Sequence, residues 1–158
     1  MYHKTSLKEL GLVIQLGHEG ELGGCSNPIA RSSFTVVDIS GRHAVSVNFC
    51  SCDKAGEAGD HAQQLLRYKL YPATDIDPNT AFTFPLLQHY HVQSLQGKIS
   101  MYDYYTSVER LTDNTGTAKC NDRYKAFMRV AAQWRHLKRL KRSGRGHDPS
   151  GVDRKSVV

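Results

Sequence analysis

The chain of 158 residues contains no hydrophobic run long enough to span a bilayer, and it has no Asn-x-Ser/Thr acceptor for glycosylation. Its first residues, Met1 to Thr5, also lack the apolar stretch and the small-residue cleavage site of a secretory signal. These absences favour a soluble protein of a reducing, intracellular compartment. In that environment the four cysteines are expected to be thiols or metal ligands instead of disulfide bridges.

Acidic residues are missing from one long C-terminal segment. Between Arg123 and Arg145 the sequence contains nine Lys or Arg and no Asp or Glu, so the rest of the chain carries a net charge of −3 although the whole chain has +6. A basic surface for binding a partner is therefore predicted near the C-terminus.

Length and composition are those of one globular domain, with 39% hydrophobic and 23% charged residues. We expect this domain to span residues 1–143. In residues 144–158 the composition turns to Gly, Asp, Pro and Ser, which predicts a flexible tail.

Most of the few cysteines are concentrated near one histidine. His18 and Cys25 lie in a Gly-rich stretch, and Cys50-Ser51-Cys52 follows a strand-like run. Two cysteines separated by one residue can both turn their sulfurs towards one tetrahedral ion, whereas a disulfide between them would be strained. We interpret His18, Cys25, Cys50 and Cys52 as a candidate zinc site. The alternative is a set of buried structural cysteines beside a surface histidine.

The N-terminal third has the alternating apolar pattern of β-strands. The segments are Leu10 to Leu16, Phe34 to Ile39 and Ala44 to Phe49. A two-residue turn at Ser40-Gly41 would join the last two segments as a hairpin.

This hairpin would pair Val36 with Val45 and Phe34 with Val47, and would bring Arg31 beside Cys50. The loop that carries Cys25 would then enter the hairpin at the end from which Cys50 and Cys52 leave. One face of the hairpin is predicted to lie in the core, with the residues Phe34, Val36, Val45, Val47 and Phe49.

The rest of the chain has mainly helical patterns. We expect a helix from about His61 to Tyr71 that Pro72 ends, a short strand at Ala81 to Phe84, and three further helices: Pro85 to Gln96, Ser100 to Thr112 and Arg123 to Arg142. Because the strands precede most of the helices, the predicted class is α+β: a small antiparallel sheet in the N-terminal third, then a helical C-terminal half, with the possible zinc site at the end of the sheet.

The last predicted helix is amphipathic and basic. Its apolar stripe contains Tyr124, Phe127, Ala131, Trp134 and Leu137, and its charges fall largely elsewhere: Lys125, Arg129, Lys138, Arg139, Lys141 and Arg142. Nine positive charges without an acidic neighbour favour contact with nucleic-acid phosphates. The alternatives are a solvated helix face, or contact with an anionic protein or membrane surface.

Catalytic motifs are missing around the residues that could carry them. Glu19, Asp38, His43 and Asp103 occur without a nucleophile elbow, a phosphate-binding loop or a carboxylate pair. We therefore expect no enzyme. The enzymatic alternative is a cysteine nucleophile, Cys50 or Cys52, with His18 or His43 as the base. We interpret three other residues as structural: His89, His91 and Cys120.

Several stretches resemble one family, the CxC-type cysteine-cluster domain found in fungal Kyakuja-Dileera-Zisupton (KDZ) transposases. The stretches are Ser6 to Leu12, Gln15 to His18, Phe49 to Cys52, Tyr71 to Thr74, Ala81 to Phe84, Leu111 to Gly116, Trp134 to Lys138 and Gly144 to Pro149. The resemblance implies a zinc-binding domain that precedes a separate catalytic part, with His18, Cys25, Cys50 and Cys52 at ligand-like positions. Family members have further Cys and His on both sides, so the resemblance also implies a fragment of a longer protein.

These observations lead to one functional expectation. The chain is expected to be a zinc-binding, non-catalytic module of a KDZ-type transposon protein that assists nucleic-acid or protein binding, in the nucleus and with the rest of a transposase polypeptide as partner. No membrane partner is expected. The alternative is a metal-free protein-interaction domain or a relic fragment without activity of its own.

Overall fold

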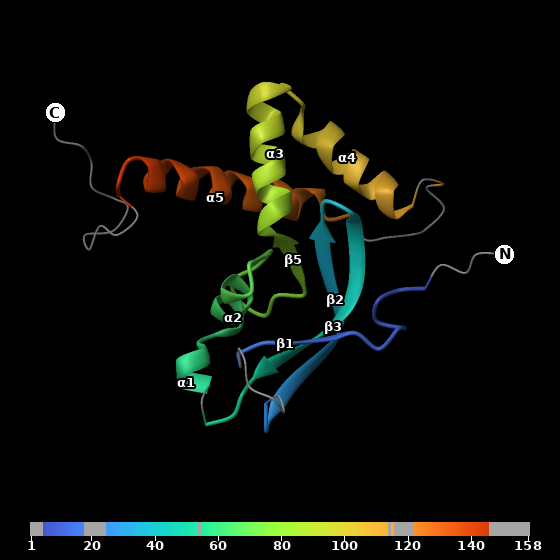
Figure 1. The fold of residues 1–158 in the computed structure, drawn as a ribbon, viewed down its shortest axis with the longest axis vertical. Coiled ribbons are helices and arrows are strands. Elements are labelled where there is room, and N and C mark those ends of the chain that lie inside the picture. Colours follow the sequence, from blue (N-terminus) through green and yellow to red (C-terminus); the bar gives the residue numbers. More distant parts are fainter. Residues whose placement is uncertain (1–4, 18–24, 54, 114, 116–121, 146–158) are drawn as a thin grey trace.

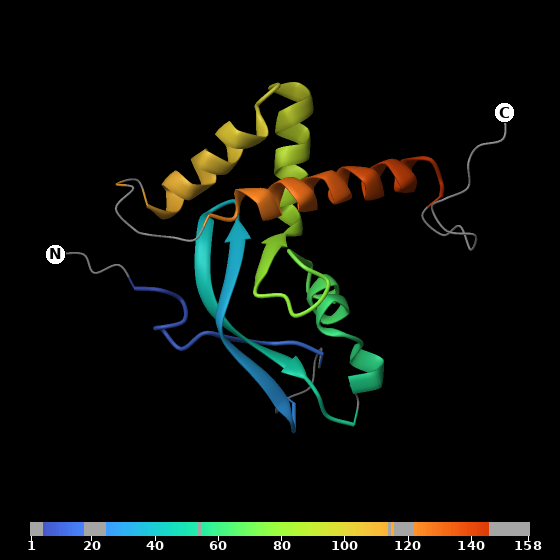
Figure 2. The same ribbon diagram turned by 180° about the vertical axis from the view of Figure 1, so that it is seen from behind.

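The computed structural model describes residues 5–17, 25–53, 55–113, 115 and 122–145. Within these residues a five-stranded mixed sheet has the order β1-β3-β2-β5-β4. Figures 1 and 2 show three helices gathered at one end of the sheet: α3 (Phe84–Gln96), α4 (Met101–Thr112) and α5 (Tyr124–Arg142). Two shorter helices lie beside its other half, α1 (Ala55–Ala58) and α2 (His61–Arg67). The predicted α+β class is confirmed, but the sheet is mixed and not antiparallel as predicted, because β1 pairs with β3, and β2 with β5, in parallel. No helix in the described ranges is both long and apolar enough to cross a membrane.

The centre of the sheet is the antiparallel hairpin of β2 (Pro28–Asp38) and β3 (Gly41–Cys50). Its two-residue turn is Ile39-Ser40 because Asp38 pairs with Gly41, so the predicted turn at Ser40-Gly41 is wrong. The carboxylate of Asp38 accepts hydrogen bonds from the backbone N–H and the hydroxyl of Ser40, at 3.4 and 3.0 Å. This local bonding holds the turn one residue earlier than the sequence pattern indicated.

The change of turn shifts the predicted register by two residues from Phe34 to Asp38, and an irregularity between Arg31 and Phe34 adds one more before them. Phe34 pairs with Val45, and Val36 pairs with His43. Since side chains alternate with period two along a strand, a shift of two keeps each side chain on its predicted face. The predicted core face is accordingly buried: Phe34, Val36, Val45, Val47 and Phe49.

The strand expected at Leu10 to Leu16 is much shorter. Only Val13–Gln15 forms β1, which runs parallel to β3. Before it, the N–H of Ser6 donates to the Glu9 carboxylate at 2.7 Å, and the N–H of Glu9 donates to the Ser6 hydroxyl at 3.2 Å. These reciprocal bonds hold a turn, so the alternating leucines before β1 do not pair in the sheet.

The expected helix from His61 to Tyr71 is also shorter. A short helix, α1 (Ala55–Ala58), precedes α2 (His61–Arg67), which ends four residues early. Leu70–Pro72 then forms β4, an edge strand antiparallel to β5 (Thr80–Thr83). Proline is tolerated in such an edge strand because one side of the strand needs no hydrogen-bond donor.

The three remaining helices agree with their predictions. They are α3 (Phe84–Gln96), α4 (Met101–Thr112) and α5 (Tyr124–Arg142). The hydroxyls of Thr83 and Ser100 cap the first two by accepting a backbone N–H. No strand follows Tyr102 in the residues that the structure describes, as the α+β prediction requires.

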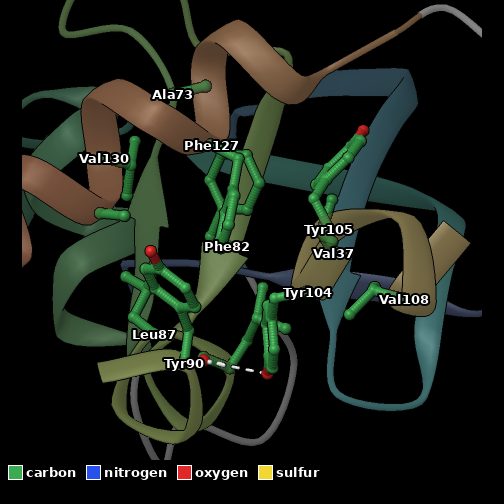
Figure 3. Packing of buried hydrophobic residues seen from close by; sticks show 12 residues of the cluster. Val37, Ala73, Phe82, Leu87, Tyr90, Tyr104, Tyr105, Val108, Phe127 and Val130 are labelled. Carbon is green, nitrogen blue, oxygen red and sulfur yellow. Dashed lines mark hydrogen bonds between the residues drawn. The ribbon is translucent and has the colours of Figure 1, made fainter. Parts of the chain in front are cut away.

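Two hydrophobic clusters fill the fold. The first joins β5 to α3, α4 and α5 around Phe127, whose ring centroid lies 5.2 Å from that of Tyr90 and 5.6 Å from those of Phe82 and Tyr105 (Figure 3). The second joins the hairpin to β1 and α2 and includes Phe49. The helical end and the cysteine-bearing end of the molecule therefore have separate cores.

Candidate metal centre

Three cysteines meet at the open end of the β2–β3 hairpin. Cys50 is the last residue of β3, Cys52 follows it by two residues, and Cys25 precedes β2. The sulfurs of Cys25, Cys50 and Cys52 all lie within 4.8 Å of one another, and the Cys50 and Cys52 sulfurs are 3.3 Å apart. None of the three forms a disulfide. They can therefore act together on one ion.

The strand pairing explains why Cys25 arrives at this place. Pro28 pairs with Cys50, so the chain before β2 runs past the end of β3. Asn27 continues the contact: its carbonyl accepts the N–H of Ser51, and its side-chain amide donates to the Ser51 carbonyl, both at 3.2 Å. The predicted convergence of the two cysteine segments is confirmed, although the residue that pairs with Cys50 differs from the predicted Arg31.

Backbone N–H groups point at the sulfurs. Burial would raise the pKa of Cys25, but hydrogen bonds from the N–H groups of Asn27 and Ser51 and from the neighbouring thiols lower it to about 6. The pKa of Cys50 is raised to about 11, chiefly by burial. One thiolate is therefore favoured among the three sulfurs near neutral pH, and its negative charge attracts a cation.

The donor set is that of a soft metal ion. Three thiol sulfurs suit zinc, copper(I) or iron–sulfur chemistry better than magnesium or calcium. A tetrahedral zinc with bonds of roughly 2.3 Å would hold the sulfurs about 3.8 Å apart, which requires only small movements here. Cys50 is 3% exposed, while Cys25 and Cys52 are half-buried. An ion can therefore enter from the side of these two residues.

The fourth predicted ligand, His18, lies outside the described residues. Its neighbour Gly17 is described and is in contact with the centre. A Cβ at Gly17 would lie 2.5 Å from the Cβ of Cys50, and the residue has a φ of +81°. The described chain therefore reaches the cysteines at the residue that immediately precedes His18.

The other titratable residues named from the sequence lie elsewhere. His43 is in β3, seven residues from Cys50, and its Nε2 is 2.9 Å from the Ser40 hydroxyl. At about 3.3 Å per residue it lies roughly 20 Å from the cysteines, too far to act as their base. Two further residues from the predictions, Glu19 and Cys120, fall outside the described part of the chain.

The two histidines interpreted as structural lie on α3. His89 makes a 2.8 Å hydrogen bond from Nδ1 to the Tyr104 hydroxyl. His91 is 7% exposed, and neither of its ring nitrogens has a hydrogen-bond partner. Burial, with the positive charges of Arg142, Arg135 and Lys138, lowers its pKa.

The basic residues of α5 fall into two groups. Lys125, Arg129, Arg139, Lys141 and Arg142 are exposed, whereas Lys138 is half-buried. Three of the six also contact neighbouring groups. The Arg129 guanidinium donates to the carbonyl of Ala73, the Arg139 guanidinium lies 3.1 Å from Nδ1 of His136, and the Lys138 ammonium lies 5.0 Å from the centre of the Trp134 ring. None of these six makes an ion pair with a carboxylate of the described residues. The predicted basic surface therefore has five exposed side chains, three of them at the C-terminal end of α5.

Sequence reasoning missed two residues that the structure brings to attention. Arg135 stacks 5.1 Å from the centre of the Tyr90 ring and donates to its hydroxyl at 3.1 Å. Gln64 is 2% exposed and bonds to the backbone of Cys50. Each resembles an ordinary polar helix residue in the sequence, and only the tertiary contact distinguishes it.

Comparison with known proteins identifies the family of this chain. Residues 7–116 match the family model described as CxC2 like cysteine cluster associated with KDZ transposases. No curated protein and no solved structure matches the chain. The matched range contains Cys25, Cys50 and Cys52, whereas α5 lies beyond it. With more than half of its residues matched, including the whole cysteine centre, the chain belongs to the family of CxC2-like cysteine cluster domains associated with KDZ transposases.

Proposed function

We propose that the chain is a zinc-binding, non-catalytic module of a KDZ-type transposon protein, and that it assists the binding of nucleic acid. The observation that carries the proposal is the meeting of three cysteine sulfurs within 4.8 Å at the end of the hairpin. Cys50 and Cys52 come from one strand end, and Cys25 comes from a segment that is distant in sequence. An ion held there would tie the two segments together.

Zinc is the proposed ion because it combines readily with thiolates and imidazole in tetrahedral structural sites. His18 is the proposed fourth ligand, and the contact of Gly17 with Cys50 supports it. A site with four protein ligands has no open position for a substrate, which favours a structural role over a catalytic one.

The experiment is to measure zinc and thiols in one preparation. Protein purified under reducing conditions without added metal is expected to contain one zinc per chain. Alkylation should then modify few thiols until a chelator removes the zinc, after which the thiols of the centre become reactive. Protein without zinc, with equal alkylation before and after chelation, would contradict the proposal and favour a metal-free interaction domain.

The nucleic-acid part of the proposal is based on α5. Lys125 lies near the start of this helix, and Arg139, Lys141 and Arg142 lie in its last turn. With a rise of 1.5 Å per residue, Lys125 and Arg142 are roughly 25 Å apart along the axis. The exposed charge is therefore concentrated at the C-terminal end, where the helix dipole also favours cations. We propose that this end contacts phosphates irrespective of base sequence.

In this proposal the module acts in the nucleus as part of a longer transposase-type polypeptide.

A further inference from the structure

The side chain of Gln64 forms three hydrogen bonds at the cysteine centre. Its Oε1 accepts the backbone N–H of Cys50 at 2.8 Å, and its Nε2 donates to the carbonyl of Cys50 at 3.2 Å. The same Nε2 donates to the carbonyl of Gly59 at 2.9 Å. Gln64 comes from α2 and is 2% exposed. All three hydrogen bonds of the side-chain amide are therefore made to backbone groups, and two of the three are made to Cys50.

This contact continues the edge of the sheet where β1 ends. The N–H of Leu16 donates to the carbonyl of Asn48 at 2.9 Å, which continues the β1–β3 pairing one residue beyond β1. A regular parallel ladder would next use the N–H of Cys50. Gly17 has a φ of +81°, outside the range of a β-strand, and a Cβ there would lie 3.2 Å from the Oε1 of Gln64. Gln64 thus supplies the donor and the acceptor that a longer β1 would have supplied.

We propose that Gln64 is a positioning residue of the metal centre, an inference that rests on the proposed function. Bonds to both the N–H and the carbonyl of Cys50 fix the backbone on either side of its Cα, and hence the direction of its Cα–Cβ bond. The sulfur is thereby aimed towards Cys25 and Cys52 before an ion arrives. Residues that hydrogen-bond to metal ligands without contacting the metal typically contribute 10–100-fold to metal affinity.

The same contact links the metal to α2. Linkage is reciprocal: if the Gln64 contact strengthens metal binding, metal binding strengthens the Gln64 contact by the same factor. The metal is thus expected to hold α2 against the sheet. Through Gly59, Gln64 also contacts the connection between α1 and α2, which Arg67 supports as well by donating to the carbonyls of Glu57 and Ala58.

The test replaces the amide with an apolar side chain of similar length, Gln64→Met. Affinity is measured for Zn²⁺ by competition with a chromophoric chelator, and Co²⁺ is used as a spectroscopic probe of sulfur ligation. We expect Gln64→Met to bind Zn²⁺ 10–100-fold more weakly and to change the sulfur-to-cobalt charge-transfer bands. Gln63→Met is the control on the same helix because Gln63 is exposed. It should bind as the wild type does.

A second control separates positioning from general loss of stability. Leu65 is fully buried in the hairpin core but makes no hydrogen bond to Cys50 through its side chain. Leu65→Val should lower the free energy of unfolding while Zn²⁺ affinity stays within about threefold of wild type and the cobalt spectrum is unchanged. If Leu65→Val loses as much affinity as Gln64→Met, the positioning role is overturned.

A readout without metal completes the test. In metal-free wild type the amide proton of Cys50 should exchange slowly with solvent, and in Gln64→Met it should exchange at least tenfold faster relative to the amide of Val47. Equal exchange, or equal Zn²⁺ affinity of Gln64→Met and wild type, would overturn this inference alone. A wild type that binds no metal through its cysteines would overturn the proposed function and this inference together.

Discussion

Gly17 lies so close to Cys50 that no side chain fits between them: a Cβ at Gly17 would be 2.5 Å from the Cβ of Cys50. Its φ of +81° is also unfavourable for other residues. Gly17→Ala is therefore expected to lower the free energy of unfolding by roughly 2 kcal/mol or more, from backbone strain plus displacement of Cys50. Chemical denaturation measures the change.

Gly11 offers a matched control for this substitution. Its φ is +83°, but nothing lies within 4 Å of a Cβ built there. Gly11→Ala should therefore show the backbone cost alone, about 1–2 kcal/mol. An equal decrease in the free energy of unfolding for Gly11→Ala and Gly17→Ala would mean that the close approach to Cys50 does not contribute to the cost.

Phe49→Ala should destabilise the hairpin core. Phe49 is fully buried, and its ring lies 4.2 Å from that of His61 and 6.4 Å from that of Phe34. Emptying such a site costs about 3–5 kcal/mol. Its cross-strand partner Ile29 is 40% exposed, so Ile29→Ala should cost much less. A loss within about 0.5 kcal/mol for Phe49→Ala, measured by denaturation, would show that this face is not the core.

The faces of the hairpin could be predicted from the sequence, but its register could not. Alternation along Phe34 to Phe49 fixes which side chains point inward, and a shift of two residues leaves that pattern intact. The position of the turn depends on the bonds of Asp38 to Ser40, which compete with the turn preference of Ser40-Gly41. Three-residue strands such as β1 and β4 have too little pattern to be recognised without their sheet partners.

The cysteine centre was also predictable only where local sequence pattern determines it. The spacing of Cys50 and Cys52 and the hairpin together indicated that Cys25 would join them. Gln64 could not be found because its role arises from the position of α2 beside the end of β3. Likewise, the spacing of α5 revealed its basic face, but not that Arg129 and Lys138 are engaged with Ala73 and Trp134.

Protonation of His91 should destabilise the fold in mild acid. Burial and the charges of Arg142, Arg135 and Lys138 lower its pKa below the ordinary value of 6.5. As the pH falls below 6.5, the unfolded chain therefore takes up this proton first, and the free energy of unfolding decreases. Denaturation at pH 7 and pH 5 should show a smaller decrease for His91→Leu than for the wild type. An identical decrease in both proteins would contradict this assignment.

Binding to duplex DNA should depend on salt through the end of α5. Each phosphate contact adds about one unit to the slope of log affinity against log salt, so changing Arg139 and Arg142 together to Gln should flatten the slope by about two. The melting temperature should barely change because both side chains are exposed. Fluorescence anisotropy at several salt concentrations measures the slope.

The control for this variant removes two charges that lie outside α5. Lys8 and Lys98 are both exposed, and neither lies on α5. Changing them together to Gln alters the net charge by the same amount as the α5 variant does. The slope of log affinity against log salt should nevertheless stay close to that of the wild type. Equal flattening by the two double variants would indicate a general charge effect, and no salt-sensitive binding by the wild type at low ionic strength would exclude the nucleic-acid role.

The central claim is that Cys25, Cys50 and Cys52 hold one zinc ion, and X-ray absorption at the zinc edge of the purified protein tests it most directly. We predict three sulfur neighbours at about 2.3 Å and one nitrogen neighbour at roughly 2.0 Å, with the nitrogen replaced by another light atom in His18→Ala. In Cys50→Ser the number of sulfur neighbours should fall to two. A first shell of oxygen and nitrogen alone in the wild type would contradict the account.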